Sequence, residues 1–490
     1  MPELRPVFLV SGALIAALGV LMVIPLLFDL FAPDPVDREN WGAFATGAII
    51  SIFVGGGAAL ASSGPIKQLG VREGFLIVAT SWTALVAFAA IPFAVGSFNL
   101  SYTDAFFEAM SGLTTTGSTI MTGLDDAPPG ILLWRSMLQW LGGVGIIIMA
   151  FAVMPALKIG GMQLFKVEAW DTSEKFIANA ATFSLSLSAI YAFFTALCFM
   201  LLWGFGMSAF DAINHAMTTV ATGGFSTRDA SIGAFIATSG APIDLVVTLF
   251  MIIGSLPFGI FLVAIMRGDV GRLFDDAQVQ FFLGLVALLT LIMLFYVYAR
   301  FDVDPFIAFR LAIFNVVSVM TGTGFATTDY SAWGGFAIGF FFAIQFIGGC
   351  AGSTSCGLKI FRLQVALASM NLYARKLSHP NGVFVAHYNG HTIAEDVFTS
   401  VLSFFFVYFA SFATLAVLLA GYDLDSLTAL SAAATAIANV GPGLGPTVGP
   451  SGTFASLPDG AKWLMSAGML LGRLEFFTVF VLFSPYFWRK

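Results

Sequence analysis

The segment 114-TTTGSTI-120 decides the fold of this chain, because it is polar and contains a glycine although it lies between two apolar runs. Three consecutive threonines and a glycine propagate a helix poorly and do not suit a lipid-facing surface. The segment has a counterpart, since DAFFEAMSGLTTTG at 104–117 aligns without gaps with DAINHAMTTVATGG at 211–224. Two later stretches, FNVVSVMTGTGFAT at 314–327 and SAAATAIANVGPGLG at 431–445, follow the same pattern with fewer identities. The motif therefore occurs four times.

The composition indicates a membrane protein with many spans. Of the 490 residues, 58% are hydrophobic and only 10% are charged, and the mean hydropathy is +0.91. A soluble domain carries about 25% charged residues. Three cysteines are too few for a disulfide framework, and the net charge of −7 gives no sign of nucleic-acid binding. We therefore expect a lipid bilayer as the surroundings of this chain and no nucleic-acid partner.

Ten apolar runs are long enough to cross a bilayer, which takes about 20 residues. They are predicted at 7–31, 42–64, 74–97, 131–156, 176–205, 241–266, 277–299, 334–358, 393–420 and 461–486. Shorter apolar pieces precede the four glycine motifs, at 101–113, 207–220, 305–320 and 425–437. These pieces are too short to cross, and we expect them to be re-entrant helices.

The basic residues of the loops predict that both termini are cytoplasmic, because Lys and Arg gather on the inner side of a membrane. With ten crossings, the inner side receives Lys67, Lys158, Lys166, Lys175, Arg267, Lys359, Arg362, Arg375 and Lys376. The outer side receives Asp125, Asp126, Asp302, Asp304, Asp423 and Asp425. All four glycine motifs then lie on the outer side.

The motif glycines Gly117, Gly224, Gly324 and Gly441 follow one another at intervals of about one hundred residues. Each interval holds a long helix, a short re-entrant helix, a glycine-centred turn and a second helix. We therefore predict an all-α polytopic membrane protein with four tandem helix–pore-loop–helix units around a pseudo-fourfold central pore, plus two N-terminal transmembrane helices. The predicted divisions are 1–70 for the two N-terminal helices and 71–170, 171–272, 273–380 and 381–490 for the four units.

Four such loops suit the binding of a cation. Backbone that is unpaired at membrane depth is tolerated where it lines a watery cavity, and rings of carbonyl oxygens replace the hydration shell of potassium in potassium channels. Glycine allows the backbone angles that bring such carbonyls into line. The C-terminal ends of the short helices add partial negative charge. Ser101 and Ser208, before two of these helices, are suitable N-cap residues.

On these four motifs the chain resembles the Trk/Ktr/HKT superfamily of cation transporters over essentially its whole length. It is most similar to the bacterial Trk-type potassium-uptake membrane subunits (TrkH/TrkG), which have two extra N-terminal helices before the fourfold repeat. Sodium-preferring plant members carry serine at the first filter glycine, so glycine in all four loops favours potassium. The resemblance implies a potassium filter formed by Thr115, Thr116, Gly117, Thr222, Gly223, Gly224, Gly322, Thr323, Gly324, Asn439, Val440 and Gly441.

The resemblance also implies a gate below the filter, made by the segment 348-GGCAGSTSCG-357 and Arg473. Its predicted residues are Gly348, Gly349, Gly352, Ser353, Thr354, Ser355, Gly357 and Arg473. Ten small residues cannot form a firm helix, and such a break inside a span is tolerated beside a cavity. An arginine inside an apolar span is a functional candidate. The alternatives are a loose kink and a purely structural ion pair of Arg473, although Glu475 points away from it on a helix.

Other polar residues receive structural interpretations. Glu108 and His215 occupy matching positions on two short helices and Asn315 lies on a third, so we expect all three to support the loops through hydrogen bonds. Arg135, early in its span, is expected to anchor at the outer interface. No nucleophile–base arrangement and no phosphate-binding loop is recognisable, so we do not expect an enzyme or a cofactor in this chain.

Together, these inferences predict that the chain is a potassium-uptake subunit of the bacterial cytoplasmic (inner) membrane, with potassium as the transported substrate. The resemblance implies a homodimer and a cytoplasmic TrkA-like regulatory subunit with RCK domains, which would bind the nucleotide. One alternative is a sodium-permeable or sodium-coupled member of the same fold. Another is a secondary transporter for small solutes, although its usual inverted repeats and midplane carboxylates are not recognisable here.

Overall fold

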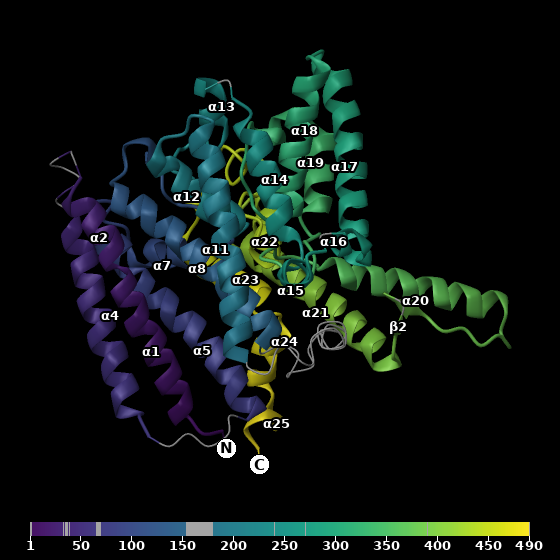
Figure 1. The fold of residues 1–490 in the computed structure, drawn as a ribbon, viewed down its shortest axis with the longest axis horizontal. Coiled ribbons are helices and arrows are strands. Elements are labelled where there is room, and N and C mark those ends of the chain that lie inside the picture. The colour runs from purple at the N-terminus through teal and green to yellow at the C-terminus, as the bar shows by residue number, and fades with distance from the viewer. Residues whose placement is uncertain are drawn as a thin grey trace.

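The computed structural model in Figure 1 describes residues 2–489 except 33, 35–37, 39, 65–69, 153–179, 240, 270 and 390. Almost all regular structure in these residues is helical. The two short strands β1 (His387–Tyr388) and β2 (His391–Thr392) pair antiparallel in the connection between two long helices. The orientation residues Lys67, Lys158, Lys166 and Lys175, and the predicted division at 170/171, lie outside the described residues.

Three N-terminal helices form one flank of the molecule, shown in purple in Figure 1: α1 (Arg5–Leu21), α2 (Val23–Leu30) and α4 (Trp41–Ala61). Helices α1 and α4 approach closely because glycines face each other. A β-carbon added at Gly12 would lie 2.7 Å from the Gly55 carbonyl oxygen. Small residues at such contacts are typical of helix packing in membranes, where close van der Waals contact drives association.

After residue 70 the same order of elements recurs four times. The first unit contains α5 (Val71–Ala89), α6 (Ile91–Val95), α7 (Tyr102–Leu113) and α8 (Pro129–Ala152). The second contains α11 (Ala180–Gly204), α12 (Ala209–Val220), α14 (Ile243–Ser255) and α15 (Phe258–Arg267). The third contains α17 (Ala277–Phe301), α18 (Pro305–Met320), α19 (Gly335–Ile344) and α20 (Ile360–Ser378). The fourth contains α21 (Glu395–Ala420), α22 (Ser426–Ala438), α23 (Asp459–Arg473) and α24 (Phe477–Phe480).

Short helical turns occupy several connections. They are η1 (Leu124–Asp126), α13 (Gly233–Ser239), α16 (Arg272–Asp275), η2 (Tyr330–Trp333), η3 (Val481–Phe483) and α25 (Pro485–Trp488).

The four short helices α7, α12, α18 and α22 begin at side-chain caps. Ser101 accepts a hydrogen bond from the Asp104 amide and Ser208 accepts one from the Asp211 amide, as predicted. Asp304 and Asp425 cap α18 and α22 in the same way. A capping oxygen satisfies an amide that has no partner within the helix, typically worth about 1 kcal/mol. Each short helix therefore starts at a defined residue and runs inward toward its glycine motif.

Among the described residues, seven helices are long and apolar enough to cross a membrane. Two further predicted spans are sharply bent, by 90° between α14 and α15 and by 105° between α23 and the segment that begins with α24. The continuous helices predicted at 241–266 and 461–486 are therefore wrong. The predicted span at 334–358 contains only the ten-residue helix α19, followed by non-helical chain up to α20.

The outer surface of this bundle is apolar, as a lipid environment requires. Large side chains such as Phe53 (80% exposed) and Phe406 (76% exposed) face outward, whereas soluble monomers rarely expose large apolar patches. The two ends of the chain lie at the same edge, at the bottom of Figure 1. There the Glu3 amide donates to the Glu73 carboxylate at 3.0 Å, and Arg72 donates to the Arg489 carbonyl at 2.6 Å. The protein is a helical multi-span membrane protein.

Candidate functional site

The four short helices end in the same backbone conformation. Directly after each short helix, one residue has a left-handed backbone. It is the residue after the C-cap in α7, α12 and α18, and the C-cap itself in α22. The φ values are 53° at Thr115, 50° at Thr222, 72° at Gly322 and 53° at Asn439. Two residues later a glycine is left-handed again, with φ values of 87° at Gly117, 80° at Gly224, 81° at Gly324 and 110° at Gly441. L side chains disfavour this region, and four equal pairs give four equal turns.

A hydrogen bond at the same position closes each turn. The residue between the two left-handed positions donates its amide to the carbonyl five residues earlier. These bonds run from Thr116 to Ser111 (2.8 Å), Gly223 to Thr218 (2.8 Å), Thr323 to Ser318 (2.9 Å) and Val440 to Thr435 (3.2 Å). This is the bond of a Schellman-type helix end, which satisfies a terminal carbonyl. The chain therefore leaves each short helix in the same direction relative to that helix.

The four turns contact one another in a closed order. A β-carbon added at Gly117 would collide with the Gly223 carbonyl oxygen of the second turn. A β-carbon added at Gly224 would collide with the Thr323 carbonyl oxygen of the third turn, and one added at Gly324 would collide with the Val440 carbonyl oxygen of the fourth turn. A β-carbon added at Gly441 would lie 2.8 Å from the Thr116 carbonyl oxygen of the first turn, which closes the order. We call residues 115–117, 222–224, 322–324 and 439–441 the four-loop ring. Every residue of the predicted filter belongs to it.

Side chains also link the loops of the ring. The Asn439 amide donates to the Thr116 hydroxyl at 2.8 Å, and the Ser118 hydroxyl donates to the Gly441 carbonyl at 2.6 Å, so the fourth loop is tied to the first. The threonines of the ring and Asn439 are fully buried, whereas Gly117, Gly224 and Gly324 are partly accessible. The ring is therefore held in protein and accessible to solvent at these three glycines.

The three side chains predicted to support the loops make the expected hydrogen bonds. Glu108 accepts from the Thr119 hydroxyl at 2.9 Å, the His215 ring bonds the Ser226 hydroxyl at 2.9 Å, and Asn315 donates to the Thr327 hydroxyl at 2.9 Å. Each comes from a short helix and holds the chain just beyond the ring glycine.

The interpretation of Arg135 as an interface anchor is wrong, because its side chain is 1% exposed and its Nε lies 2.9 Å from Glu108. Gln139, one turn later on α8, was missed altogether. It donates to the Gly223 carbonyl at 2.6 Å and accepts from the Phe225 amide at 3.0 Å. The available signal was the spacing of four residues, which puts both polar side chains on one face of an apolar helix.

The predicted gate segment is non-helical but firmly held. It lies against the break between α14 and α15. The Cys350 amide donates to the Ser255 carbonyl at 2.9 Å, the Thr354 amide donates to the Gly254 carbonyl at 3.1 Å, and the Gly352 carbonyl accepts from the Phe258 amide at 3.0 Å. These bonds satisfy backbone groups that the bend leaves without helical partners. The predicted break in the span is therefore a non-helical segment whose backbone groups have fixed partners.

The other residues predicted to form the gate are held by hydrogen bonds within the gate segment or to chain close to it. Gly348 donates its amide to the Leu358 carbonyl at 2.9 Å, and Gly349 donates to the Ser355 hydroxyl at 2.8 Å. Ser353 donates to the Cys350 carbonyl at 2.6 Å, and Ser355 also reaches the Thr321 carbonyl, directly before the third loop of the ring. Gly352 and Gly357 are left-handed, with φ values of 73° and 70°.

Arg473 ends helix α23 and joins the gate segment to α8. Its Nη1 donates to the Thr354 carbonyl at 3.2 Å and to the Cys356 sulfur at 2.6 Å, and its Nη2 donates to the Gly142 carbonyl at 2.9 Å. The Cys356 sulfur also lies 3.8 Å from the Thr115 hydroxyl of the ring. The arginine is 2% exposed. The structure thus brings Arg473, the gate segment and the ring into one connected cluster.

Glu475 does not pair with Arg473 but with Arg362, at 2.5 Å. This agrees with the expectation that Glu475 points to another helix. It corrects the placement of Arg362 in a loop, because Arg362 belongs to helix α20, and its side chain is fully buried and lies 3.6 Å from the centre of the Phe404 ring. Glu475 itself has φ 59° at the 105° bend. The pair therefore connects the bend to helix α20.

Replacing Glu475 with glutamine is expected to lower the free energy of unfolding by roughly 3 kcal/mol, because a buried arginine loses its charged partner. Thermal unfolding of the purified protein in detergent measures this change. Glu395, exposed in the first turn of α21, is the matched control, and its replacement by glutamine is expected to change stability by less than about 0.5 kcal/mol. Equal losses in both variants would contradict a specific contribution from the pair.

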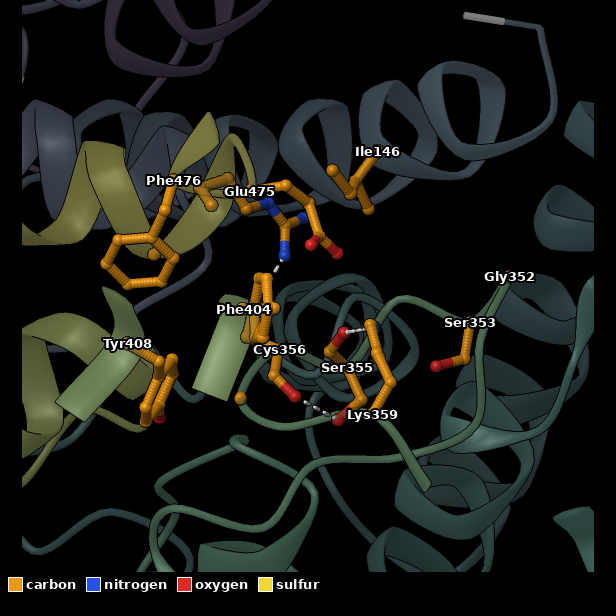
Figure 2. Close-up of a pocket in the computed structure, with 13 residues that line it drawn as sticks. Ile146, Gly352, Ser353, Ser355, Cys356, Lys359, Phe404, Tyr408, Glu475 and Phe476 are labelled. Atoms are coloured by element: carbon orange, nitrogen blue, oxygen red, sulfur yellow. Dashed lines mark hydrogen bonds between the residues drawn. The ribbon is translucent and has the colours of Figure 1, made fainter. Parts of the chain in front are cut away.

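A pocket, which we call the inner pocket, lies between the gate segment and the bend, and its polar lining consists of Ser353, Ser355, Cys356, Lys359, Tyr408, Arg473 and Glu475. Figure 2 shows Glu475 and Phe476 on one side of this pocket and Cys356, Ser355 and Lys359 on the other. Two of its basic groups, Lys359 and Arg473, have no carboxylate in salt-bridge contact within the described part of the chain. A cation that passed from the ring into this pocket would meet a positive field.

Comparisons with known proteins agree with this architecture. A family model described as TrkH, cation transport protein, matches residues 42–490. The Trk system potassium uptake protein TrkI of Halomonas elongata is 43% identical over 99% of this chain and 97% of its own length. The corresponding protein TrkH of Escherichia coli K12 is 36% identical over 99% of both. The crystal structure of the potassium transporter TrkH from Vibrio parahaemolyticus matches with a TM-score of 0.90 at 34% identity, covering 99% of this chain and 100% of that one.

Proposed function

Since this chain belongs to the TrkH family of cation transport proteins, we propose that it carries potassium ions across the bacterial cytoplasmic membrane through the four-loop ring. Its full-length relatives are named potassium uptake proteins of the Trk system. Membership in a family of transport proteins also agrees with the expectation that the chain is not an enzyme. The observation that carries the proposal is the closed contact of four equivalent glycine turns.

In this proposal the ring binds a dehydrated potassium ion through backbone carbonyl oxygens. Four turns of equal backbone geometry present equivalent carbonyls, and glycine is needed because each turn meets the carbonyl of the next without space for a β-carbon. The C-terminal ends of α7, α12, α18 and α22 adjoin the ring and favour a cation through their partial negative charge. Partial solvent access at Gly117, Gly224 and Gly324 would allow an ion to reach the ring.

We further propose that the gate segment and Arg473 control exit from the ring. Arg473 joins this segment to α8, and Cys356 connects it to Thr115. Lys359 adds a second positive charge in the inner pocket. In the conformation described here these groups oppose the passage of a cation, so conduction requires that the segment or the arginine move.

The inner side of the molecule is the proposed docking side for a TrkA-like regulatory subunit, with both termini cytoplasmic and two copies of the chain forming a homodimer. The support is family membership together with helix α20, which projects from the bundle in Figure 1 and carries exposed Arg375 and Lys376 near its end. Nucleotide would bind the partner, because its regulatory domains and not this chain are expected to hold a phosphate site.

Expression in a potassium-uptake-deficient bacterium tests the transport proposal. The intact chain, produced with a TrkA-like partner, is expected to restore growth at limiting potassium and to support rubidium uptake. Immunoblotting of membranes gives the amount of protein for comparison. Absence of both growth and rubidium uptake, despite normal amounts in the membrane, would overturn the proposal. Strong sodium uptake without potassium preference would favour the sodium-permeable alternative.

Replacing Gly117 with serine is expected to reduce the preference for potassium over sodium by about tenfold, which corresponds to about 1.4 kcal/mol. The added side chain collides with the Gly223 carbonyl and so shifts the first loop of the ring relative to the second. Competition of sodium with rubidium uptake measures the preference. Gly123 is the matched control, because it is also left-handed (φ 74°) but has no atom within 4 Å of an added β-carbon. Unchanged preference in the Gly117 variant would refute the assignment of the ring.

A further inference from the structure

A buried ion pair lies directly outside the ring in the first unit. Glu108 of α7 and Arg135 of α8 are 2.9 Å apart, and their side chains are 0% and 1% exposed. Moving two charges out of water costs several kcal/mol per ion, and their attraction regains this only with additional hydrogen bonds. Apolar side chains of similar volume often stabilise a protein as well or better. General stability alone therefore does not account for this pair.

The hydrogen bonds of Glu108 fix the first loop. Its carboxylate accepts from the Thr119 hydroxyl at 2.9 and 3.1 Å and from the Ile120 amide at 3.0 Å. Thr119 follows the ring glycine Gly117 by two residues. The chain therefore leaves the ring at a position that the carboxylate determines.

The remaining hydrogen bonds of Arg135 reach the second loop as well as the first. Its Nη1 donates to the Ser226 carbonyl at 2.7 Å, two residues after Gly224, and its Nη2 donates to the Thr119 hydroxyl at 3.2 Å. The guanidinium carbon also lies 4.1 Å from the centre of the Phe225 ring. One planar group thus sets the separation between the exits of two neighbouring loops.

The fourth loop depends on the first. Ser118 donates to the Gly441 carbonyl at 2.6 Å, and the Thr119 carbonyl accepts from the Phe454 amide at 2.9 Å. Residues 118 and 119 directly follow the first loop of the ring, and Thr119 is bonded to the Glu108 carboxylate. A shift of the first loop therefore changes both the Ser118–Gly441 and the Thr119–Phe454 hydrogen bonds. The ion pair therefore acts on three of the four loops.

The equivalent positions of the other units carry no charge pair. Nine residues before the ring glycine stand His215 in the second unit, Asn315 in the third and Ala432 in the fourth. His215 and Asn315 bond within their own unit, to Ser226 and Thr327. Asp229, five residues after Gly224, also accepts from the Gly123 and Leu124 amides farther along the first loop, at 2.9 and 3.1 Å. Among the described residues, however, Arg135 is the one charged side chain that bonds the chain two residues after two different ring glycines.

We propose that Glu108 and Arg135 are positioning residues that determine how strictly the ring discriminates potassium from sodium. This inference rests on the proposed function, because it assigns the ring as the place where the ion is selected. Neither side chain touches the ion. The pair holds the first loop at a fixed distance from the second and the fourth, and loss of that distance lets the ring contract around the smaller sodium ion.

Glu108→Gln tests the proposal, because glutamine keeps the shape and the acceptor oxygen but removes the charge that holds Arg135. The chain is expressed with its TrkA-like partner, and rubidium uptake is measured against increasing sodium. We expect sodium to compete about tenfold more strongly than in the unchanged chain, as for the loss of a charge-assisted hydrogen bond. The KM for rubidium is expected to rise, whereas the amount of protein in the membrane is expected to stay near normal.

A matched control is available in another ion pair between two helices, in which the carboxylate is buried and the arginine is 21% exposed. Asp244 of α14 bonds Arg310 of α18 at 2.6 and 2.8 Å, but neither forms a hydrogen bond to the ring. Asp244→Asn is expected to lower the melting temperature without changing sodium competition. If Glu108→Gln shifted melting and left competition unchanged, as Asp244→Asn is expected to do, the pair would be merely structural and the proposal would be wrong.

Thr119→Val provides a second test in case Glu108→Gln fails to accumulate. It removes the hydroxyl that joins the pair to the first loop and leaves both charges in place. The same increase in sodium competition is expected, and normal competition in this variant would overturn the inference. Failure of the unchanged chain to take up rubidium would instead overturn the proposed function, so the two failures are distinguishable.

Discussion

Replacing Gly224 with alanine is expected to reduce rubidium influx, which reports potassium uptake, to one tenth of normal or less. The β-carbon would overlap the Thr323 carbonyl oxygen and lie 2.9 Å from the carbonyl carbon. Both atoms belong to backbone, so no side-chain rotation relieves the collision. The φ of 80° adds a cost of about 1–2 kcal/mol for an L residue. The second and third loops must therefore separate, and the ring loses its closed order.

Gly123→Ala separates this collision from simple backbone strain. Gly123 has φ 74° but open space around an added β-carbon, and it lies in the loop that follows the first turn of the ring. Its variant is expected to keep at least half of the normal influx. Rubidium uptake corrected for the amount of membrane protein measures both variants. Similar influx in the two would mean that the contact between Gly224 and Thr323 does not define the transport path.

Replacing Arg473 with alanine is expected to raise cation flux about tenfold. A unit charge about 10 Å from a cation raises its energy by about 1.7 kcal/mol at an effective dielectric constant of about 20. The substitution also removes the hydrogen bonds to Thr354 and Gly142, which join the gate segment to α8. The substitution therefore removes both the electrostatic barrier to the cation and the attachment of the gate segment to α8. Rubidium flux into proteoliposomes that contain the purified chain measures the change without the regulatory subunit.

Arg473→Lys distinguishes the two contributions. Lysine keeps the positive charge but cannot reach Thr354, Cys356 and Gly142 with one planar group. A flux close to normal in this variant would assign the barrier to charge, and a flux close to that of Arg473→Ala would assign it to the attachment of the segment. Normal flux in the alanine variant would refute a role for Arg473 in the gate.

Much of the fold follows from the sequence because spans and caps have local causes. Ser208 and Asp425 mark where short helices begin, and the apolar runs mark the long ones. The two bends were missed because hydropathy does not depend on the direction of a helix axis. Pro257 was a usable signal for the first bend, since the residue before a proline disfavours helix. No proline marks the second bend, where Glu475 has a left-handed φ of 59° and pairs with the buried Arg362.

The candidate site was predictable as far as it is repetitive. The glycine intervals place Gly117 and its three counterparts in equivalent turns, but they do not say which turn contacts which. Contacts between units depend on side chains such as Arg135 and Gln139, whose targets are backbone carbonyls of a loop about ninety residues away. Every residue has a backbone carbonyl, so the sequence does not indicate which carbonyl a side chain will contact. Such contacts can be identified only from the folded structure.

The second helices of the four units differ on the side away from the ring glycines. Helix α8 runs unbroken over its described length, α14 turns into α15, the third unit is interrupted before α20, and α23 turns into α24. In a channel built from four identical chains, any change of sequence is repeated in every quarter. Joining the quarters into one polypeptide removes that constraint. If the four-loop ring is the transport path that we propose, its fourfold regularity is compatible with four different structures beyond it, and a change in one quarter would be enough to control the path.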